Sequence, residues 1–143
     1  MPVSFVMTAQ EREEFLAGVH VGVVAVERPG RAPLATPVWY DYAPGGDVLI
    51  WTDRGTVKER LFREAGRFSI CAQDETLPYR YVTAEGPVAE IERAPTEDEA
   101  LQITARYMPA EDAARWVADN LGPDSLLVRM RPDRWLSADY GKA

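Results

Sequence analysis

The sequence has very few residues of the kinds that bind metals or form cross-links. Cys71 is the only cysteine and His20 the only histidine among 143 residues. A single cysteine excludes disulfide scaffolds, cysteine-rich zinc sites and iron–sulfur clusters within one chain. Zinc hydrolysis and a Ser-His-Asp triad also lack their usual residues, so no metal site is expected.

Long apolar runs are missing as well. No run approaches the roughly 20 residues needed to span a bilayer, and residues 1–13 lack the charge-then-apolar order of a signal peptide. We therefore expect a cytoplasmic protein that does not associate with membranes. The length favours a single domain over residues 1–143, long enough to bury a core.

Positive charge is scarce over the chain but concentrated in one segment. The formal net charge of −7 argues against a nucleic-acid partner. Between Arg54 and Arg67, however, five basic residues accompany two acidic ones, which suits a small anionic ligand. Only Lys58 and Lys142 are lysines among sixteen basic residues. That bias is typical of a GC-rich genome, and it makes Lys58 stand out.

The segment from Trp51 to Lys58 combines an unusual set of local features. An apolar strand ends there, the chain turns at Gly55, and Thr56 begins a helix as its N-cap. Lys58 falls in the first helical turn, where cations are disfavoured because the free N–H groups are already positive. A bound phosphate would resolve this conflict by accepting the N–H groups near Val57 together with the lysine. The alternative is a solvated lysine without a role, since one misplaced charge costs only about 0.3–1 kcal/mol.

Two other helix starts in the chain serve as a comparison. Each of the three has a threonine followed three residues later by a glutamate, the pattern of a capping box: Thr8 with Glu11, Thr56 with Glu59, and Thr96 with Glu99. The capping pattern alone therefore indicates no ligand. Only the second places a lysine in its first turn.

The remaining pattern predicts strands joined by short turns, with four helices. Strands are expected at 19–27, 34–42, 47–52, 68–72, 79–91, 125–130 and 134–137, and helices at 8–17, 56–65, 96–108 and 110–121. Pro37 marks an edge or bulge, and Gly86-Pro87 a barrel corner. The fold class is mainly β with flanking helices (α+β), as a six- to seven-stranded antiparallel barrel. The last two helices are expected to cover the barrel and to bind no ligand.

This order of elements resembles the pyridoxamine 5'-phosphate oxidase-like flavin and deazaflavin oxidoreductases, especially the branch of probable F420-dependent enzymes. The resemblance rests on the Pro-x-Trp-Tyr strand, the Trp-Thr strand end, the Thr-x-Lys helix start and the Glu-Gly-Pro-x-Ala-Glu-Ile strand. It implies a split β-barrel homodimer with cofactor clefts between subunits. It also implies hydride transfer between the deazaflavin F420, or alternatively FMN, and a small-molecule substrate.

The resemblance also assigns cofactor-binding positions. Lys58 and Thr56 match phosphate ligands, and Thr52, preceded by Trp51, matches the residue facing the ring or ribityl chain. Val38 and Trp39 match the edge beside the ring, and the segment containing Tyr81 matches the part given by the second subunit. The full set of expected cofactor-binding residues is Val38, Trp39, Trp51, Thr52, Thr56, Val57, Lys58 and Tyr81.

Two alternatives remain open. Trp39 and Trp51 serve either as core or as a wall beside a planar ligand. The protein either turns over a substrate or only holds a flavin, haem or tetrapyrrole, because split barrels do both. The C-terminal segment 134–141 lacks the substrate motif of the true oxidases, so pyridoxamine phosphate is not the expected substrate.

Overall fold

The computed structural model describes residues 4–142 and contains seven strands and four α-helices. The strands are β1 (Gly22–Arg28), β2 (Arg31–Val38), β3 (Val48–Asp53), β4 (Arg67–Asp74), β5 (Arg80–Glu90), β6 (Ser125–Met130) and β7 (Arg134–Asp139). The helices are α1 (Ala9–Ala17), α2 (Val57–Ala65), α3 (Glu97–Thr104) and α4 (Ala110–Asn120), followed by the 3-10 turn η1 (Tyr140–Lys142). The expected order of strands and helices is confirmed.

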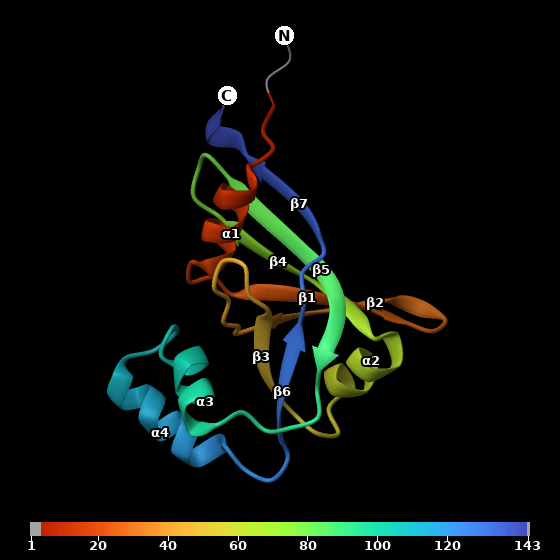
Figure 1. The fold of residues 1–143 in the computed structure, drawn as a ribbon, viewed down its shortest axis with the longest axis vertical. Helices are drawn as coiled ribbons and strands as arrows, with labels where there is room; N and C mark the ends of the chain where they lie inside the picture. Colours follow the sequence, from red (N-terminus) through yellow and green to blue (C-terminus); the bar gives the residue numbers. More distant parts are fainter. Residues whose placement is uncertain (1–3, 143) are drawn as a thin grey trace.

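All strand pairs are antiparallel and form one curled sheet with the order β2-β1-β4-β5-β6-β3, while β7 pairs with β5 (Figure 1). Strands β2 and β3 are the two ends of this path. Within residues 4–142 they are joined by one isolated backbone pair, Asp41 with Leu49. The barrel is therefore split between β2 and β3, as expected for the fold class.

Strand β5 turns the corner of the barrel. Its first part pairs with β4 and β7, and after Gly86 it pairs with β6 through Val88 and Glu90. A Cβ atom on Gly86 would lie 1.8 Å from the carbonyl oxygen of Arg131, so only glycine lets the chain after β6 pass this closely. The prediction of a corner at Gly86-Pro87 is confirmed.

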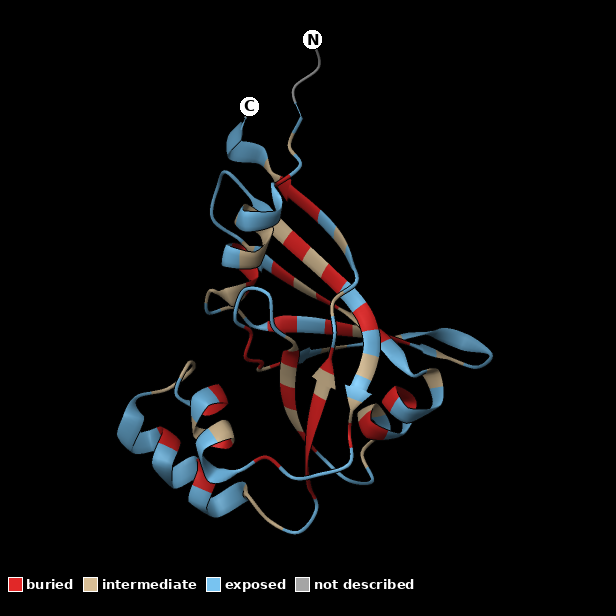
Figure 2. Cartoon of the chain, in the orientation of Figure 1, coloured by how far each residue is buried: buried red, intermediate tan, exposed pale blue. Residues whose placement is uncertain are grey.

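Side chains alternate between a buried and a more exposed face along β4 and β5, as Figure 2 shows. The inward faces form one apolar core. Its fully buried members include Val24, Val26, Tyr40, Val48, Ile50, Phe62, Ile70, Val82, Leu126, Val128 and Met130. This core fixes the curvature of the sheet and so the width of the split.

The helices cover different parts of the barrel (Figure 1). Helix α1 buries Phe15 and Leu16, and α2 buries Leu61 and Phe62 near β1 and β4. Helices α3 and α4 pack against each other as a pair beside β3. No helix within residues 4–142 has the length and apolarity required to cross a membrane.

Two predicted boundaries were wrong for the same reason. Helix α3 ends at Thr104 and not at Met108, and β2 ends at Val38 and not at Tyr42. The Tyr107 hydroxyl accepts the Tyr40 N–H at 3.1 Å and lies 2.6 Å from the His20 carbonyl oxygen. Arg106 donates to the carbonyl oxygens of residues 17 and 18 at 3.1 and 2.7 Å. These contacts tie the chain after α3 to the barrel, so neither element continues.

Candidate functional site

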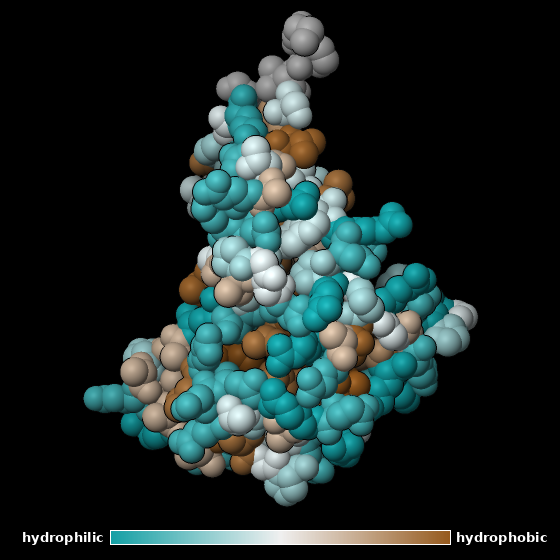
Figure 3. Space-filling model, viewed as in Figure 1, coloured by the Kyte–Doolittle hydropathy of each residue, from teal (hydrophilic) through white to brown (hydrophobic). Residues whose placement is uncertain are grey.

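A pocket of about 550 Å³ lies at the split of the barrel, between the end of β2, the end of β3 and the α3–α4 pair. In Figure 3 apolar side chains gather over β3 and β6, between polar surfaces formed by the helices on either side. The pocket is lined by Val21, Pro37, Val38, Trp39, Trp51, Thr52, Asp53, Lys58, Ile103, Thr104, Trp116 and Asn120. This size and apolar character are typical of a small-molecule site.

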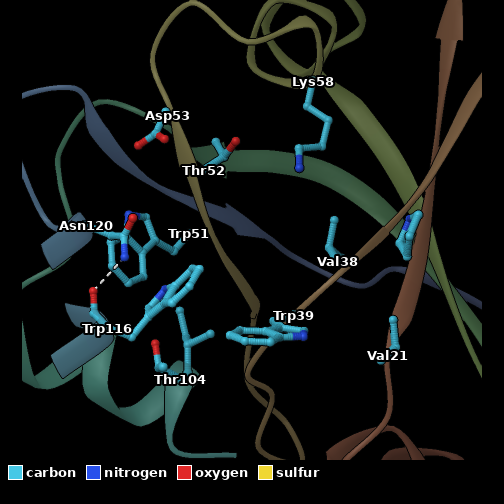
Figure 4. Close-up of a pocket in the computed structure, with 12 residues that line it drawn as sticks. Val21, Val38, Trp39, Trp51, Thr52, Asp53, Lys58, Thr104, Trp116 and Asn120 are labelled. Atoms are coloured by element: carbon cyan, nitrogen blue, oxygen red, sulfur yellow. Dashed lines mark hydrogen bonds between the residues drawn. The ribbon is translucent and has the colours of Figure 1, made fainter. Parts of the chain in front are cut away.

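Lys58 projects from the first turn of α2 into the pocket, between Thr52 and Val38 (Figure 4). Its side chain is half-buried, and within residues 4–142 its ammonium group makes no salt bridge or hydrogen bond. Burial lowers the pKa of Lys58, and the carboxylate of Asp53 opposes this with a smaller effect. A partly desolvated cation without a partner favours an anionic ligand at this place.

The start of α2 differs from the other two helix starts. Thr56 accepts the backbone N–H of Glu59 at 3.3 Å, as predicted for an N-cap. The second half of the predicted capping box does not form at α2, although it forms at α1 and α3. Glu59 is buried and instead accepts from Arg63 Nε at 3.0 Å. The Glu59 carboxylate is therefore directed away from the N-terminus of α2.

Aromatic side chains form the opposite wall. Trp39 stacks on Tyr107 at 5.0 Å between ring centroids and lies 5.9 Å from Trp116 at an angle of 51°. Trp51 lines the same space from β3. Of the two interpretations of Trp39 and Trp51, the pocket wall is the one the structure supports, because both side chains are half-buried and border the pocket.

Five of the eight expected cofactor-binding residues line the pocket: Val38, Trp39, Trp51, Thr52 and Lys58. Thr56 lies directly behind Thr52, with 3.5 Å between their hydroxyl oxygens, and Val57 points to solvent at 49% exposure. Tyr81 lies on another face of the sheet, beside Tyr79 and Tyr140. Within one chain, Tyr81 is thus outside the pocket.

The sequence did not indicate the part of the pocket that the helix pair provides. We expected α3 and α4 to cover the barrel only, and this was wrong. They contribute Ile103, Thr104, Trp116 and Asn120 to the lining. One indication was available, because Trp116 lies beside the apolar stripe of α4 and remains 44% exposed. Asp53 was also missed, although strand alternation places it on the same face as Trp51.

Solved structures share this fold over nearly the whole chain. The conserved hypothetical protein Rv2991 from Mycobacterium tuberculosis matches with a TM-score of 0.80 and 25% identity, covering 99% of this chain and 91% of that one. An F420 reductase matches at 0.68 with 23% identity, covering 87% and 94%. A FAD-binding protein from Mesorhizobium loti matches at 0.65 with 19% identity, covering 92% and 91%.

The family comparison agrees with these structures. No curated protein matches the sequence significantly. The model of the pyridoxamine 5'-phosphate oxidase family, whose fold and flavin-type cofactor binding agree with a pocket at the barrel split, matches residues 8–135. The chain therefore belongs to the pyridoxamine 5'-phosphate oxidase family.

Proposed function

We propose that this protein is an oxidoreductase that transfers a hydride between the deazaflavin F420 and a small molecule. The observation that carries the proposal is Lys58, a half-buried cation without a partner at a helix start that opens into an aromatic-walled pocket. A cofactor phosphate would accept the first-turn N–H groups of α2 and the Lys58 ammonium. Thr52 and Thr56 offer hydroxyl groups beside it.

The bound deazaflavin supplies the hydride chemistry, and the protein holds it in place and excludes water. Val21, Pro37 and Val38 provide apolar surface for a ring on the Lys58 side of the pocket. No side chain is assigned as a proton donor. A relative with the same fold is described as an F420 reductase, which supports this choice of cofactor.

FMN is the competing cofactor within the same proposal, since another relative is described as FAD-binding. Exposed arginines near the pocket favour the deazaflavin. Arg54 and Arg60 flank Lys58, and Arg60 has a weak partner in Glu64 at 3.9 Å. Their positive charge would suit the polyglutamyl tail of F420, which FMN lacks.

We further propose a homodimer with the cofactor site at its interface. Strand register aligns one row of apolar or weakly polar side chains across the outer face of the sheet: Pro37, Val23, Cys71, Thr83 and Leu136. Val23 is 40% and Leu136 61% exposed, so this row is available for burial against a second copy. Tyr81 lies on the same face, where it could reach the pocket of a partner.

The first test is binding and turnover by the purified protein. We expect it to bind F420 with micromolar or better affinity, and FMN more weakly, as measured by cofactor fluorescence. Reduced F420 should then transfer its hydride to a conjugated acceptor. Oxidation of the deazaflavin after mixing would report this transfer. A protein that binds neither cofactor at micromolar concentrations contradicts the proposal, and one that binds F420 without any turnover is a binding module.

A variant pair tests the role of Lys58. Lys58→Ala should weaken F420 binding about 10- to 100-fold, because a hydrogen bond to a charged group contributes about 1.5–3 kcal/mol. The control is Lys142→Ala, which removes the other lysine, paired with Glu11 at 2.8 Å and far from the pocket. Equal affinities for the two variants would rule out Lys58 as the phosphate ligand.

A further inference from the structure

The pocket has two chemically different halves because of the alternation along β3. Thr52 points into the barrel and is 7% exposed, next to the Lys58 half described above. Trp51 and Asp53 lie on the other face of β3, toward the α3–α4 pair. Figure 4 shows Asp53, Trp51, Trp116 and Asn120 grouped on one side of the pocket, away from Lys58 and Val38.

Indole rings dominate this outer half. Three of the four tryptophans in the chain line it, namely Trp39, Trp51 and Trp116. Tyr107 lies nearly parallel to Trp39, with 5° between the ring planes, so it holds that indole in a fixed orientation. Trp116 remains 44% exposed and belongs to no buried cluster. The rings thus border open space, which suits a flat ligand.

The polar groups of the outer half are acceptors of hydrogen bonds. The Asp53 carboxylate makes no salt bridge or hydrogen bond within residues 4–142. The Asn120 amide nitrogen donates one of its two N–H groups to the Trp116 carbonyl oxygen at 2.9 Å, and the Asn120 side-chain oxygen is available as an acceptor. A ligand that satisfies both groups must bring N–H or O–H donors. An anionic ligand would be repelled by Asp53.

We propose that the outer half binds a planar, electron-poor nitrogen heterocycle, neutral or cationic, whose N–H edge faces Asp53 and Asn120. Indole faces carry negative charge density and attract electron-poor or cationic rings. A carboxylate can accept two parallel N–H groups from such an edge. The proposal that the heterocycle binds rests only on the arrangement of the indole rings, Asp53 and Asn120. Its assignment as the hydride acceptor rests on the proposed function. In turnover, reduced F420 gives up a hydride and a proton, and one double bond of the heterocycle gains both.

The first experiment measures binding in the absence of any deazaflavin. We would titrate the protein with 2-aminoquinoline, whose protonated form presents two adjacent N–H donors, and with quinoline-2-carboxylate, the matched anion, by isothermal titration calorimetry. The amine is expected to bind at least about 10-fold more tightly than the carboxylate, since charge-assisted hydrogen bonds contribute about 1.5–3 kcal/mol. Equal or reversed affinities overturn the inference.

Three variants locate the binding site. Trp116→Ala and Asp53→Asn change exposed side chains, and each should weaken 2-aminoquinoline binding about 5- to 10-fold. Asp53→Asn should also reduce the preference for the amine over the carboxylate. Trp135→Phe is the control, because Trp135 is the tryptophan outside the pocket. If both pocket variants bind the amine as tightly as the control does, the heterocycle binds elsewhere and the inference fails.

Repeating the titration with saturating F420 separates this inference from the proposed function. A ternary complex supports the two-half pocket. Full displacement of 2-aminoquinoline by F420 means that the deazaflavin ring occupies the indoles, which overturns the inference but not the proposed function. A protein that binds 2-aminoquinoline as predicted but no F420 refutes the proposed function and retains the ligand class.

Discussion

Lys58 combines two properties that are rarely found together on a surface helix, partial burial and the absence of a counter-charge. The sequence predicted the conflict at this position, because a lysine in a first helical turn opposes the helix dipole. It could not predict that the side chain points into a pocket. That depends on the split of the barrel, which brings β2, β3 and α2 together from separate parts of the chain.

The lowered pKa of Lys58 predicts the pH dependence of cofactor binding. Burial favours the neutral amine, so the ammonium that binds phosphate is lost at a lower pH than in an ordinary lysine. F420 affinity should therefore be constant near neutral pH and fall as the pH rises through this lowered pKa. Titrations between about pH 7 and pH 10.5 would measure this. Lys58→Arg should move the decrease to higher pH, because arginine stays protonated, and an unchanged profile in that variant would contradict the assignment.

At the scale of elements, the three helix starts show how one sequence pattern gives two structures. Glu11 and Glu99 close their capping boxes, but Glu59 turns toward Arg63, which also donates to the Ile91 carbonyl oxygen at 2.9 Å. The local pattern predicted three equal boxes. The difference arises because Arg63 is also held by Ile91, which lies 28 positions further along the chain. The local sequence around α2 cannot reveal such a contact.

This arrangement predicts that Arg63 affects anion binding although it lies outside the pocket. In Arg63→Met, the Glu59 carboxylate is free to return to the Thr56 N–H, and its charge would then lie at the start of α2. F420 affinity should fall about 3- to 10-fold, since a charge at a helix terminus contributes about 0.3–1 kcal/mol or somewhat more when partly buried.

The double variant Arg63→Met/Glu59→Gln provides the control for that prediction. It removes the released charge, so affinity should recover toward that of the unchanged protein. A merely destabilised helix would not recover in this way. Continued weak binding in the double variant, at full occupancy of the folded state, would therefore exclude the mechanism.

The corner of β5 gives a prediction about stability. Gly86→Ala should prevent folding or lower the free energy of unfolding by about 3 kcal/mol or more, because the new Cβ atom overlaps the Arg131 carbonyl oxygen. Urea denaturation followed by circular dichroism would measure this. Gly122→Ala is the matched control, since a Cβ atom there meets no atom within 4 Å and the residue has no positive φ. Similar stabilities of the two variants would contradict this prediction, because they would mean that the chain at Arg131 moves away from residue 86 at little cost.

The helix pair marks the limit of prediction from sequence at this scale. Helix α4 buries Ala113 and Val117, but the sequence of such an apolar stripe does not say whether it faces a core or a pocket. Arg106 and Tyr107 decide this by binding carbonyl oxygens 87 to 89 residues away. The periodicity of apolar residues along a helix gives no information about contacts between residues so far apart in the chain.

At the scale of the whole molecule, the order of the strands along the chain and their antiparallel pairing were predictable, whereas the face proposed for a partner follows only from register. The row through Val23 and Leu136 crosses five strands, so the sequence of any single strand contains only one of its residues. The adjacent row combines two alanines with the polar or charged residues Ser69, Glu85 and Arg134. This contrast places the proposed dimer interface on one part of the outer face.

The dimer proposal predicts that Val23→Asp disrupts association. A carboxylate buried at an interface without a partner is strongly unfavourable, so the variant should elute as a monomer in size-exclusion chromatography with light scattering. F420 affinity should decrease as well if the partner completes the site. Val6→Asp, which changes a valine that is 66% exposed outside this row, should remain dimeric. A monomeric unchanged protein, or a dimeric Val23→Asp variant, would contradict the proposed interface.

The position of α3 and α4 in the chain has a consequence for how the pocket can evolve. Both helices lie in the single connection between β5 and β6, and they supply the wall of the outer half of the pocket. The inner half of the pocket, with Val38, Thr52 and Lys58, is built from β2, β3 and α2, which lie outside that connection. Exchange of residues 97–120 for the corresponding segment of a relative would thus alter which molecules are accepted while leaving the inner half intact. On the proposed function, part of the substrate-contacting surface therefore lies in one replaceable segment, and directed evolution of new substrate preferences should begin there.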